Sequence, residues 1–432
     1  MLNILGAYHF ERVFPVDPKT EKRPREAGMH LWYIVRFDKD TDLKEAARQL
    51  RKLGEISKIQ SNPTIRRAYD PKKKPLYLSA SDLQHVTRTS EGLTFNDPGL
   101  KHQWHYQNTG SYDFVKEGAE AIAGADVNCG EAWKLCKGDP TIIVAVLDEG
   151  VMWNHPDLIG NMWTNEAEEI GSTEDKDGNG YKGDRYGYNF VKNTGVISWT
   201  SAEDTGHGTH VAGTIAAVNG NNKGVGGIAG GDGTENSGVK IMTCQLFDGA
   251  YGCTLAAEAK AIKYAADNGA VILQCSWGYN SPDANEALGY TPGPKDEQDW
   301  ENQYPLEKEA LDYFIHNAGS PNGVIDGGLA IFASGNEYAP SSSYPAGYSK
   351  CISVSAIAAD FTPSSYTNYG EEITLCAPGG DGDYYGTPGV ADDEFAWEGK
   401  TQGLILSTAI KNGQPAYAYM EGTSMACPHV SG

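Results

Sequence analysis

Apolar and polar residues follow one another along most of this chain in blocks whose lengths suit strands and helices. An apolar, β-branched run at 142–151 and an apolar run at the start of 330–340 predict buried strands. Small and apolar residues recur with helical spacing within 204–217 and again within 421–432. Because predicted strands and helices alternate along the sequence, the pattern predicts an α/β fold with a mainly parallel sheet flanked by helices.

The first ninety residues follow a different pattern. Residues 31–37 read as a strand, 42–54 as an amphipathic helix, and 55–69 as a further strand. These short elements predict a small α+β domain over 1–92, which includes a linker at its end. The larger α/β domain is expected over 93–432.

Charge divides the chain close to the same boundary. Residues 1–90 carry 18 Lys and Arg against 11 Asp and Glu, a balance of +7, and residues 91–432 carry 17 against 46, a balance of −29. The two parts therefore attract one another at long range, with a solvated basic face as the alternative explanation. The total of −22 argues against a nucleic-acid partner. No apolar run reaches the length of a transmembrane helix.

Three polar residues stand where these blocks meet turns. Asp148 lies at the end of the first apolar run, His207 follows a Gly-rich turn, and Ser424 opens the last helical stretch. A serine hydroxyl is a weak nucleophile at neutral pH, so an imidazole must take its proton and a carboxylate must fix the imidazole tautomer. The chain therefore carries the parts of a nucleophilic triad. Taken singly, each residue is more often a strand cap, a loop residue or a helix cap.

The sequence around these residues resembles the subtilisin-like serine peptidases, the subtilases. The matching strings are IIVAVLDEGV at 142–151, DTGHGTHVAGTIAA at 204–217, AIFASGNEYAP at 330–340 and EGTSMACPHVSG at 421–432. They occur in family order, and further matches extend from about residue 95 onward. The resemblance implies a subtilisin-like sheet and a serine endopeptidase. It assigns the triad to Asp148, His207 and Ser424, and the side chain that binds the oxyanion to Asn336.

The resemblance also suggests how substrate binds and how the enzyme is made. In LQCSWGYN at 273–280, the residues Ser276, Trp277 and Gly278 match the strand that binds polypeptide substrates in extended form. The N-terminal domain resembles a subtilase propeptide, ferredoxin-like in fold, which inhibits the enzyme as part of the same chain until it is removed. An unrelated small α+β domain is the alternative.

A second candidate site lies in EDKDGNGYKGD at 174–184. Asp175, Asp177, Asn179 and Asp184 offer hard oxygen ligands, and the glycines between them allow the sharp turns that a calcium site requires. The twelfth position from Asp175 is Tyr186 rather than the Glu of an EF-hand, so a helix-loop-helix site is not expected. We expect calcium at this loop, and a solvated acidic turn is the alternative.

Two features bear on whether the chain is active. Glu149 follows Asp148 where many subtilases have Ser or Thr, and it adds a second carboxylate near the triad. The helix expected at Ser424 has nine residues before the chain ends at Gly432, whereas in the family it continues as a buried central helix. The resemblance therefore implies a truncated C-terminus. A peptide-binding fragment without catalysis is the alternative to a working endopeptidase.

The family also implies a location. Subtilases of this kind are secreted or held in the cell envelope, although the first residues MLNILGAYHF have neither a basic nor an adequate apolar region of a signal peptide. The expected partners are polypeptide substrates and the propeptide of the same chain.

Overall fold

A parallel sheet forms the centre of the chain in the computed structural model, which describes residues 2–6, 8–38, 40–65, 75–78, 83, 94–112, 118–201, 203–249, 251–319, 325–385 and 403–432. Its strands lie in the order β11-β10-β9-β8-β4-β6-β5 and pair in parallel, and β7 joins β6 antiparallel. The bounds are β4 Ile143–Glu149, β5 Gly187–Asn189, β6 Lys240–Asp248, β7 Tyr251–Gly252, β8 Ile272–Cys275, β9 Leu329–Ala333, β10 Ile352–Ile357 and β11 Leu375–Pro378. This arrangement confirms the predicted α/β fold with a mainly parallel sheet.

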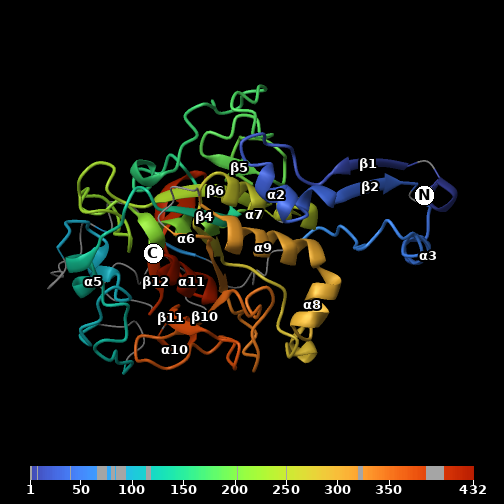
Figure 1. The fold of residues 1–432 in the computed structure, drawn as a ribbon. Helices are drawn as coiled ribbons and strands as arrows, with labels where there is room; N and C mark the ends of the chain where they lie inside the picture. The colour runs from blue at the N-terminus through green and yellow to red at the C-terminus, as the bar shows by residue number, and fades with distance from the viewer. Residues whose placement is uncertain are drawn as a thin grey trace.

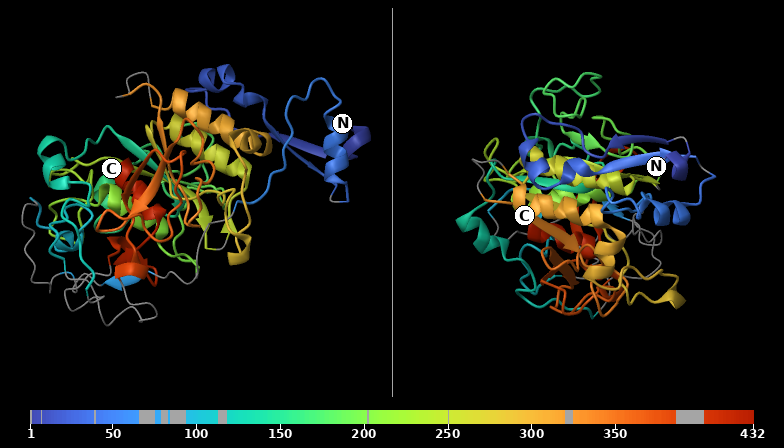
Figure 2. Two further views of the ribbon diagram at one scale, coloured as in Figure 1. Left: turned by 90° about the horizontal axis from the view of Figure 1, so that it is seen from below. Right: turned by 45° about the vertical axis from the view of Figure 1, so that its right-hand side comes forward.

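Helices cover both faces of this sheet (Figures 1 and 2). Val144 and Val146 of β4 pack with Val211 of α6 and Met425 of α11 in one core, while the alternate β4 residues pack with α7 and α9 in another. Because successive side chains of a strand point to opposite faces, a strand covered on both sides reads as a continuous apolar run. The larger helices are α5 Cys129–Leu135, α6 His207–Ala216, α7 Leu255–Asp267, α8 Glu297–Gln303, α9 Pro305–Asn317 and α11 Thr423–Ser431.

A smaller antiparallel sheet leads into the last helix. It consists of β12 Ile405–Lys411, β13 Gln414–Met420 and β3 Leu76–Leu78, in the order β12-β13-β3. The His210 ring of α6 lies against this sheet, with Nε2 at 3.1 Å from the carbonyl oxygen of Ile405 and 3.0 Å from that of Ala418. These bonds fix the sheet to α6. The remaining short helices are α10 Gly382–Tyr385, η2 Leu100–His102, η3 Ile159–Asn161 and η4 Glu286–Leu288.

The N-terminal residues form an arm and a region that lies on the main body. The arm holds the antiparallel pair β1 Tyr8–Arg12 and β2 Tyr33–Phe37 with the helices α1 Leu2–Leu5 and α3 Leu43–Leu50, and it projects from the body (Figures 1 and 2). The strand and the helix predicted here are thus present. The further strand predicted at 55–69 is wrong for residues 55–65, which belong to no named strand and form only an isolated bridge between Thr64 and Thr254. Residues 66–69 lie outside the described residues. A ferredoxin-like sheet would need more strands than these two, so that part stays a prediction.

Between the arm's strands, the chain lies on α7 and α9 through α2 Lys22–Glu26 and η1 Met29–Leu31. Val13, Met29 and Ile65 are buried in the same core as both large helices. Because their side chains are less than a tenth exposed, the N-terminal region and the main body share one continuous apolar interior.

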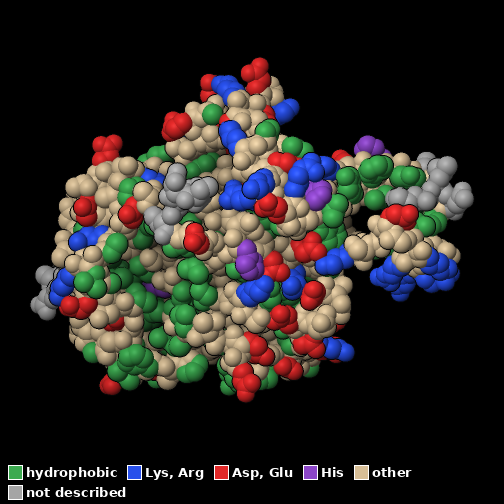
Figure 3. Space-filling model, in the orientation of Figure 1, with side chains coloured by type: hydrophobic (Ala, Val, Ile, Leu, Met, Phe, Trp, Pro, Cys, Tyr) green, Lys and Arg blue, Asp and Glu red, His purple; other side chains and the backbone are tan. Residues whose placement is uncertain are grey.

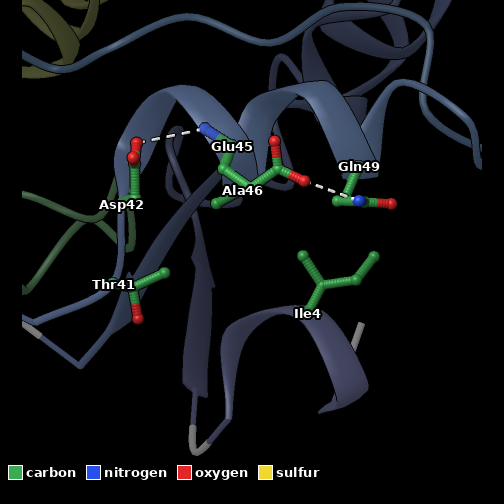
Figure 4. A pocket seen from close by; sticks show the side chains of 6 residues that line it. All are labelled: Ile4, Thr41, Asp42, Glu45, Ala46 and Gln49. Atoms are coloured by element: carbon green, nitrogen blue, oxygen red, sulfur yellow. Dashed lines mark hydrogen bonds between the residues drawn. The ribbon is translucent and has the colours of Figure 1, made fainter.

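Basic side chains gather on the arm over α3 (Figure 3). They include the exposed Lys44, Arg48, Arg51 and Lys52. A cavity of about 470 Å³ lies between α1 and α3, and its lining residues are Ile4, Thr41, Asp42, Glu45, Ala46 and Gln49 (Figure 4). Asp42 caps α3 by accepting from the backbone N–H of Glu45, and Glu45 accepts from Gln49. These polar groups of the cavity therefore form hydrogen bonds within α3 and at its start.

Candidate active site

Asp148 and His207 meet at the carboxyl end of β4. Asp148 is buried, and its two carboxylate oxygens lie 2.8 and 2.9 Å from Nδ1 of His207. Because a carboxylate only accepts, Nδ1 carries the proton and Nε2 is left as the basic nitrogen. The imidazole is therefore held in the tautomer that a general base needs.

Local backbone geometry explains how His207 reaches this place. The residue begins α6, and the preceding Gly206 has φ of 73°, a left-handed conformation that glycine adopts without strain. A side chain on Gly208 would place its Cβ 2.3 Å from the carbonyl oxygen of Glu149. Glycine on both sides of His207 thus lets the first turn of α6 approach the end of β4.

Ser424 stands in the first turn of α11, after Gly422 with φ of 145°. Its hydroxyl donates to the carbonyl oxygen of Ser276 at 3.2 Å, and the Ser276 hydroxyl donates back to the carbonyl oxygen of Ser424 at 2.8 Å. The first N–H groups of a helix have no partner within the helix. Here the N–H of Thr423 donates to Asn336 Oδ1, and those of Met425 and Ala426 donate to the carbonyl oxygen of Gly422. The serine stands among them at the positive end of a helix dipole.

Asn336 lies across from the start of α11. Its Oδ1 accepts both the backbone N–H and the hydroxyl of Thr423, each at 2.9 Å. A backbone N–H can only donate, so this contact identifies Oδ1 and leaves Nδ2 as a donor on the other side of the amide. A Cβ placed on Gly422 would lie 3.8 Å from both Asn336 Oδ1 and Ser424 Cβ, so the two side chains are near neighbours.

The segment Ser276–Gly278 follows β8 directly and lies beside Ser424. Besides the two bonds above, the Ser276 hydroxyl accepts from Nε2 of Gln274 at 2.8 Å. Trp277 is nearly buried and packs edge-on against Phe332. Of the three predicted substrate-binding residues, Ser276 therefore contacts the predicted nucleophile directly.

The loop at 174–184 separates its predicted ligands into two groups. Asp175 and Asp177 join the buried Glu168, with one oxygen of each within 4.8 Å of the others. Asn179 instead donates to Asp184 at 3.0 Å, and Tyr264 donates to the same carboxylate at 2.8 Å. Burial, offset in part by these two bonds, raises the pKa of Asp184 to about 6.

A second pair of carboxylates was not predicted from the sequence as a site. Asp97 and Asp157 share Asn221, whose backbone N–H donates to Asp97 at 3.1 Å and whose side chain donates to Asp157 at 2.6 Å. Burial raises the pKa of Asp97 to about 6 and that of Asp157 to about 7, and the charge of Asp97 adds to the second shift.

These residues come from distant parts of the chain. Asp97 lies just before η2 and Asp157 just before η3, while Asn221 follows α6. Glu168, likewise, precedes the acidic loop by several residues. Spacing alone gives no sign of such groupings, because the tertiary fold brings them together.

Comparison with known proteins agrees with this geometry. A model of the Subtilase family (Peptidase S8) matches residues 139–432, which include Asp148, His207, Asn336 and Ser424. The chain belongs to the subtilase family. Like this subtilase, the serine protease of Aeromonas sobria, solved in complex with its chaperone, has the same fold, with a TM-score of 0.55, 20% identity, and coverage of 81% of this chain and 55% of that one.

Several proteins of known name are similar to this subtilase in sequence. Halolysin of Haloferax mediterranei is 30% identical over 84% of this chain and 53% of its own length. The extracellular protease of Xanthomonas campestris is 28% identical over 92% of this chain and 55% of its own length. A calcium-dependent protease of Nostoc is 29% identical over 76% of this chain and 42% of its own length. This subtilase thus spans about half the length of these relatives.

Among the described residues of this subtilase, no helix combines the length and the apolar character that a membrane crossing requires.

Proposed function

We propose that this chain is a serine endopeptidase that hydrolyses polypeptides with Asp148, His207 and Ser424. The observation that carries the proposal is the bond between His207 Nδ1 and Asp148, which leaves Nε2 basic at the carboxyl end of β4. Ser424 is the second residue of α11. In catalysis the hydroxyl turns from the Ser276 carbonyl to Nε2, which takes its proton as the oxygen attacks the scissile carbonyl. The same nitrogen then protonates the leaving amine.

Two donors would hold the oxyanion. Nδ2 of Asn336 is directed away from Thr423 by the contacts of its own oxygen, and the backbone N–H of Ser424 lies in the first turn of α11. Fixed donors of this kind stabilise the negative charge that develops in the tetrahedral intermediate. Ser276, Trp277 and Gly278 would then pair with the substrate backbone.

Residues 1–92 would act as a propeptide within the same chain, and the contacts of 60–65 support this role. Oε1 of Gln60 accepts the N–H of Leu306 at the start of α9, and Oδ1 of Asn62 accepts the N–H of Ala256 at the start of α7, both at 2.9 Å. Ile65 donates its N–H to the carbonyl oxygen of Cys253. The tail predicted at 70–92 lies outside the described residues except at 75–78 and 83.

Calcium fits both carboxylate groups as a resident ion. Glu168, Asp175 and Asp177 in one group, and Asp97 and Asp157 in the other, provide the hard oxygen ligands that calcium takes. Burial, and in addition the negative charge of Asp97, raises the pKa of Asp157, so a nearby positive charge is needed to keep its carboxylate ionised at lower pH. Calcium would supply that positive charge and fix the loops around it. The calcium-dependent relative supports this proposal.

Secretion, or attachment to the cell envelope, is proposed on the relatives alone. One relative carries the word extracellular in its name. An export assay with the natural gene tests this point.

Labelling with phenylmethylsulfonyl fluoride, with peptide hydrolysis measured in parallel, tests the catalytic proposal. The reagent is expected to modify Ser424 in the unmodified chain, and His207→Ala is expected to abolish both labelling and hydrolysis because the base is gone. Ser424→Ala should remove labelling while peptide binding persists. Peptide binding without labelling or turnover in any form would instead support the alternative, a peptide-binding fragment.

A further inference from the structure

Glu149 is a buried carboxylate beside the triad, and the triad chemistry does not use it. It is 1% exposed. One of its oxygens, Oε2, accepts the backbone N–H of His207 at 3.0 Å and the backbone N–H of Thr205 at 3.1 Å. The Thr205 hydroxyl donates to the same carboxylate at 3.3 Å. The group therefore binds the turn that carries the catalytic imidazole, and it does so through the backbone.

This contact replaces a helix cap that α6 lacks. Most helices begin at a Ser, Thr, Asp or Asn whose side chain accepts a first-turn N–H. The cap residue of α6 is Gly206, which has no side chain to offer. Glu149 supplies the missing acceptor from another element, and its negative charge lies at the positive end of the α6 dipole.

Glu149 is also joined to the other side of the triad. Its backbone N–H donates to Oδ1 of Asp148 at 2.6 Å, the same oxygen that lies 2.8 Å from His207 Nδ1. The pairing of β4 with β6 shifts register between Asp148 and Glu149, so that Asp148 pairs with Gln245 and Glu149 with Phe247. This irregularity turns both carboxylates toward the start of α6.

We propose that Glu149 is a positioning residue of the triad. Its backbone N–H fixes the Asp148 carboxylate, and its side chain fixes the first turn of α6. One residue thus sets the distance between the acid and the imidazole. This inference rests on the proposed peptidase function. It concerns a position where the sequence departs from the family pattern of Ser or Thr, so the resemblance assigns it no role.

Two conservative substitutions separate position from charge. Glu149→Gln keeps an oxygen that can accept the two N–H groups but removes the charge. Glu149→Asp keeps the charge but withdraws the oxygens by one methylene. Because small misplacements of a catalytic group can cost about a hundredfold in rate, we expect Glu149→Asp to lower kcat about 10- to 100-fold. We expect kcat for Glu149→Gln to stay within about threefold of the unmodified enzyme.

The measurements are kcat and KM on one peptide substrate, the rate of Ser424 modification by phenylmethylsulfonyl fluoride, and Tm. We expect KM to change less than about twofold in both variants, because Glu149 does not contact the predicted substrate strand. The modification rate should fall with kcat. Asp296→Ala is the matched control, since it removes the side-chain cap of α8 and is expected to lower Tm without changing kcat.

The outcomes are distinguishable. If Glu149→Asp keeps the kcat of the unmodified enzyme, or if Glu149→Gln loses as much kcat as Glu149→Asp, the positioning role is wrong. If Glu149→Asp does not fold, the kcat of Glu149→Gln becomes the deciding measurement. A tenfold loss of kcat in Glu149→Gln would contradict the proposal. An unmodified chain that matches Ser424→Ala in having no turnover would instead overturn the peptidase function itself.

Discussion

The orientation of Asn336 follows from a single neighbour. Thr423 donates twice to Oδ1, so the amide cannot rotate without losing both bonds, and Nδ2 stays on the side away from Thr423. A donor that is fixed before the reaction stabilises the transition state without reorganisation at the moment of charge development. Asn336 is therefore expected to contribute to kcat rather than to substrate affinity.

Asn336→Ala tests this expectation. We expect kcat to fall about 100- to 1000-fold, a magnitude measured on an oxyanion asparagine of this same family rather than obtained from this structure. KM should change little, because the bond forms only with the oxyanion. Steady-state kinetics on a peptide substrate give the answer, and Thr423→Ser, which keeps both donors to Asn336, is the control. A large rise in KM with unchanged kcat would contradict the assignment.

Buried imidazoles give a pH dependence of stability. Burial lowers the pKa of His210 to about 3, against an ordinary value of 6.5. As pH falls from 6.5 toward 3, His210 becomes protonated in the unfolded chain but stays neutral in the folded chain. The unfolding free energy therefore falls by up to about 1.4 kcal/mol per pH unit for this group. Carboxylates with raised pKa, such as Asp157, act in the opposite direction below pH 7.

His210→Gln isolates the imidazole from those carboxylates. The amide N–H groups of Gln can still donate to the two carbonyls that His210 contacts, but the side chain does not titrate. We expect the slope of the unfolding free energy between pH 6.5 and 4 to decrease by about one proton relative to the unmodified chain. Denaturant unfolding at several pH values measures the slope, and an unchanged slope would show that His210 is not the group responsible.

The starts of α7 and α9 link the N-terminal region to the main body. In each helix, one backbone N–H donates to a side chain of the segment at 60–65: that of Ala256 in α7 and that of Leu306 in α9. The same region carries two ion pairs, between Lys58 and Glu309 and between Arg23 and Asp267 at 3.7 Å. Trp32 Nε1 also donates a hydrogen bond to Glu309. Removal of the propeptide would expose these N–H groups at both helix starts to water.

Asn62→Ala in a Ser424→Ala background tests this link without self-cleavage. We expect the amide of Ala256 to exchange its hydrogen faster, because loss of a helix cap costs about 0.5–2 kcal/mol. Asn62→Asp, which keeps an acceptor, is the matched control and should preserve protection. Hydrogen exchange followed by mass spectrometry reads the effect. Equal protection in all three chains would show that Asn62 does not hold the helix start.

Some of the fold and the site could be predicted from the sequence, because the physical cause of each element is local. β4 is buried on both faces and reads as one apolar run, and glycines mark the turns at His207 and Ser424. The strand expected at 55–69 was wrong for residues 55–65, since these residues satisfy their backbone and side-chain groups against α7 and α9 rather than in a sheet. Only the tertiary fold groups Asp97 with Asp157 and adds Glu168 to Asp175, so spacing could not indicate those pairs.

The distribution of charge over the whole molecule supports the calcium proposal. The main part of the chain carries a large negative excess, whereas basic side chains gather on the arm (Figure 3). Ionised carboxylates that are buried close together repel one another unless a cation lies between them. Removal of calcium is therefore expected to destabilise the main body.

Asp157→Asn tests which carboxylates respond to calcium. In the unmodified chain, calcium at about 100 times its dissociation constant should raise the unfolding free energy by about 2.7 kcal/mol relative to chelator. Asp157→Asn is expected to lose most of that response. Asp360→Asn, at an exposed carboxylate that only caps a turn, should retain it. Thermal unfolding with and without chelator measures the difference, and an equal calcium response in all three chains would contradict this site.

Intact mass spectrometry of the full chain beside its Ser424→Ala variant, after incubation with and without calcium, is the most direct test of the triad. The account predicts that the unmodified chain loses an N-terminal piece of roughly 75–95 residues while the variant stays whole, because only the former has the nucleophile. The mass of the remaining chain then identifies the cleaved bond. If both chains stay whole under conditions in which they are folded, self-processing by Asp148, His207 and Ser424 is contradicted.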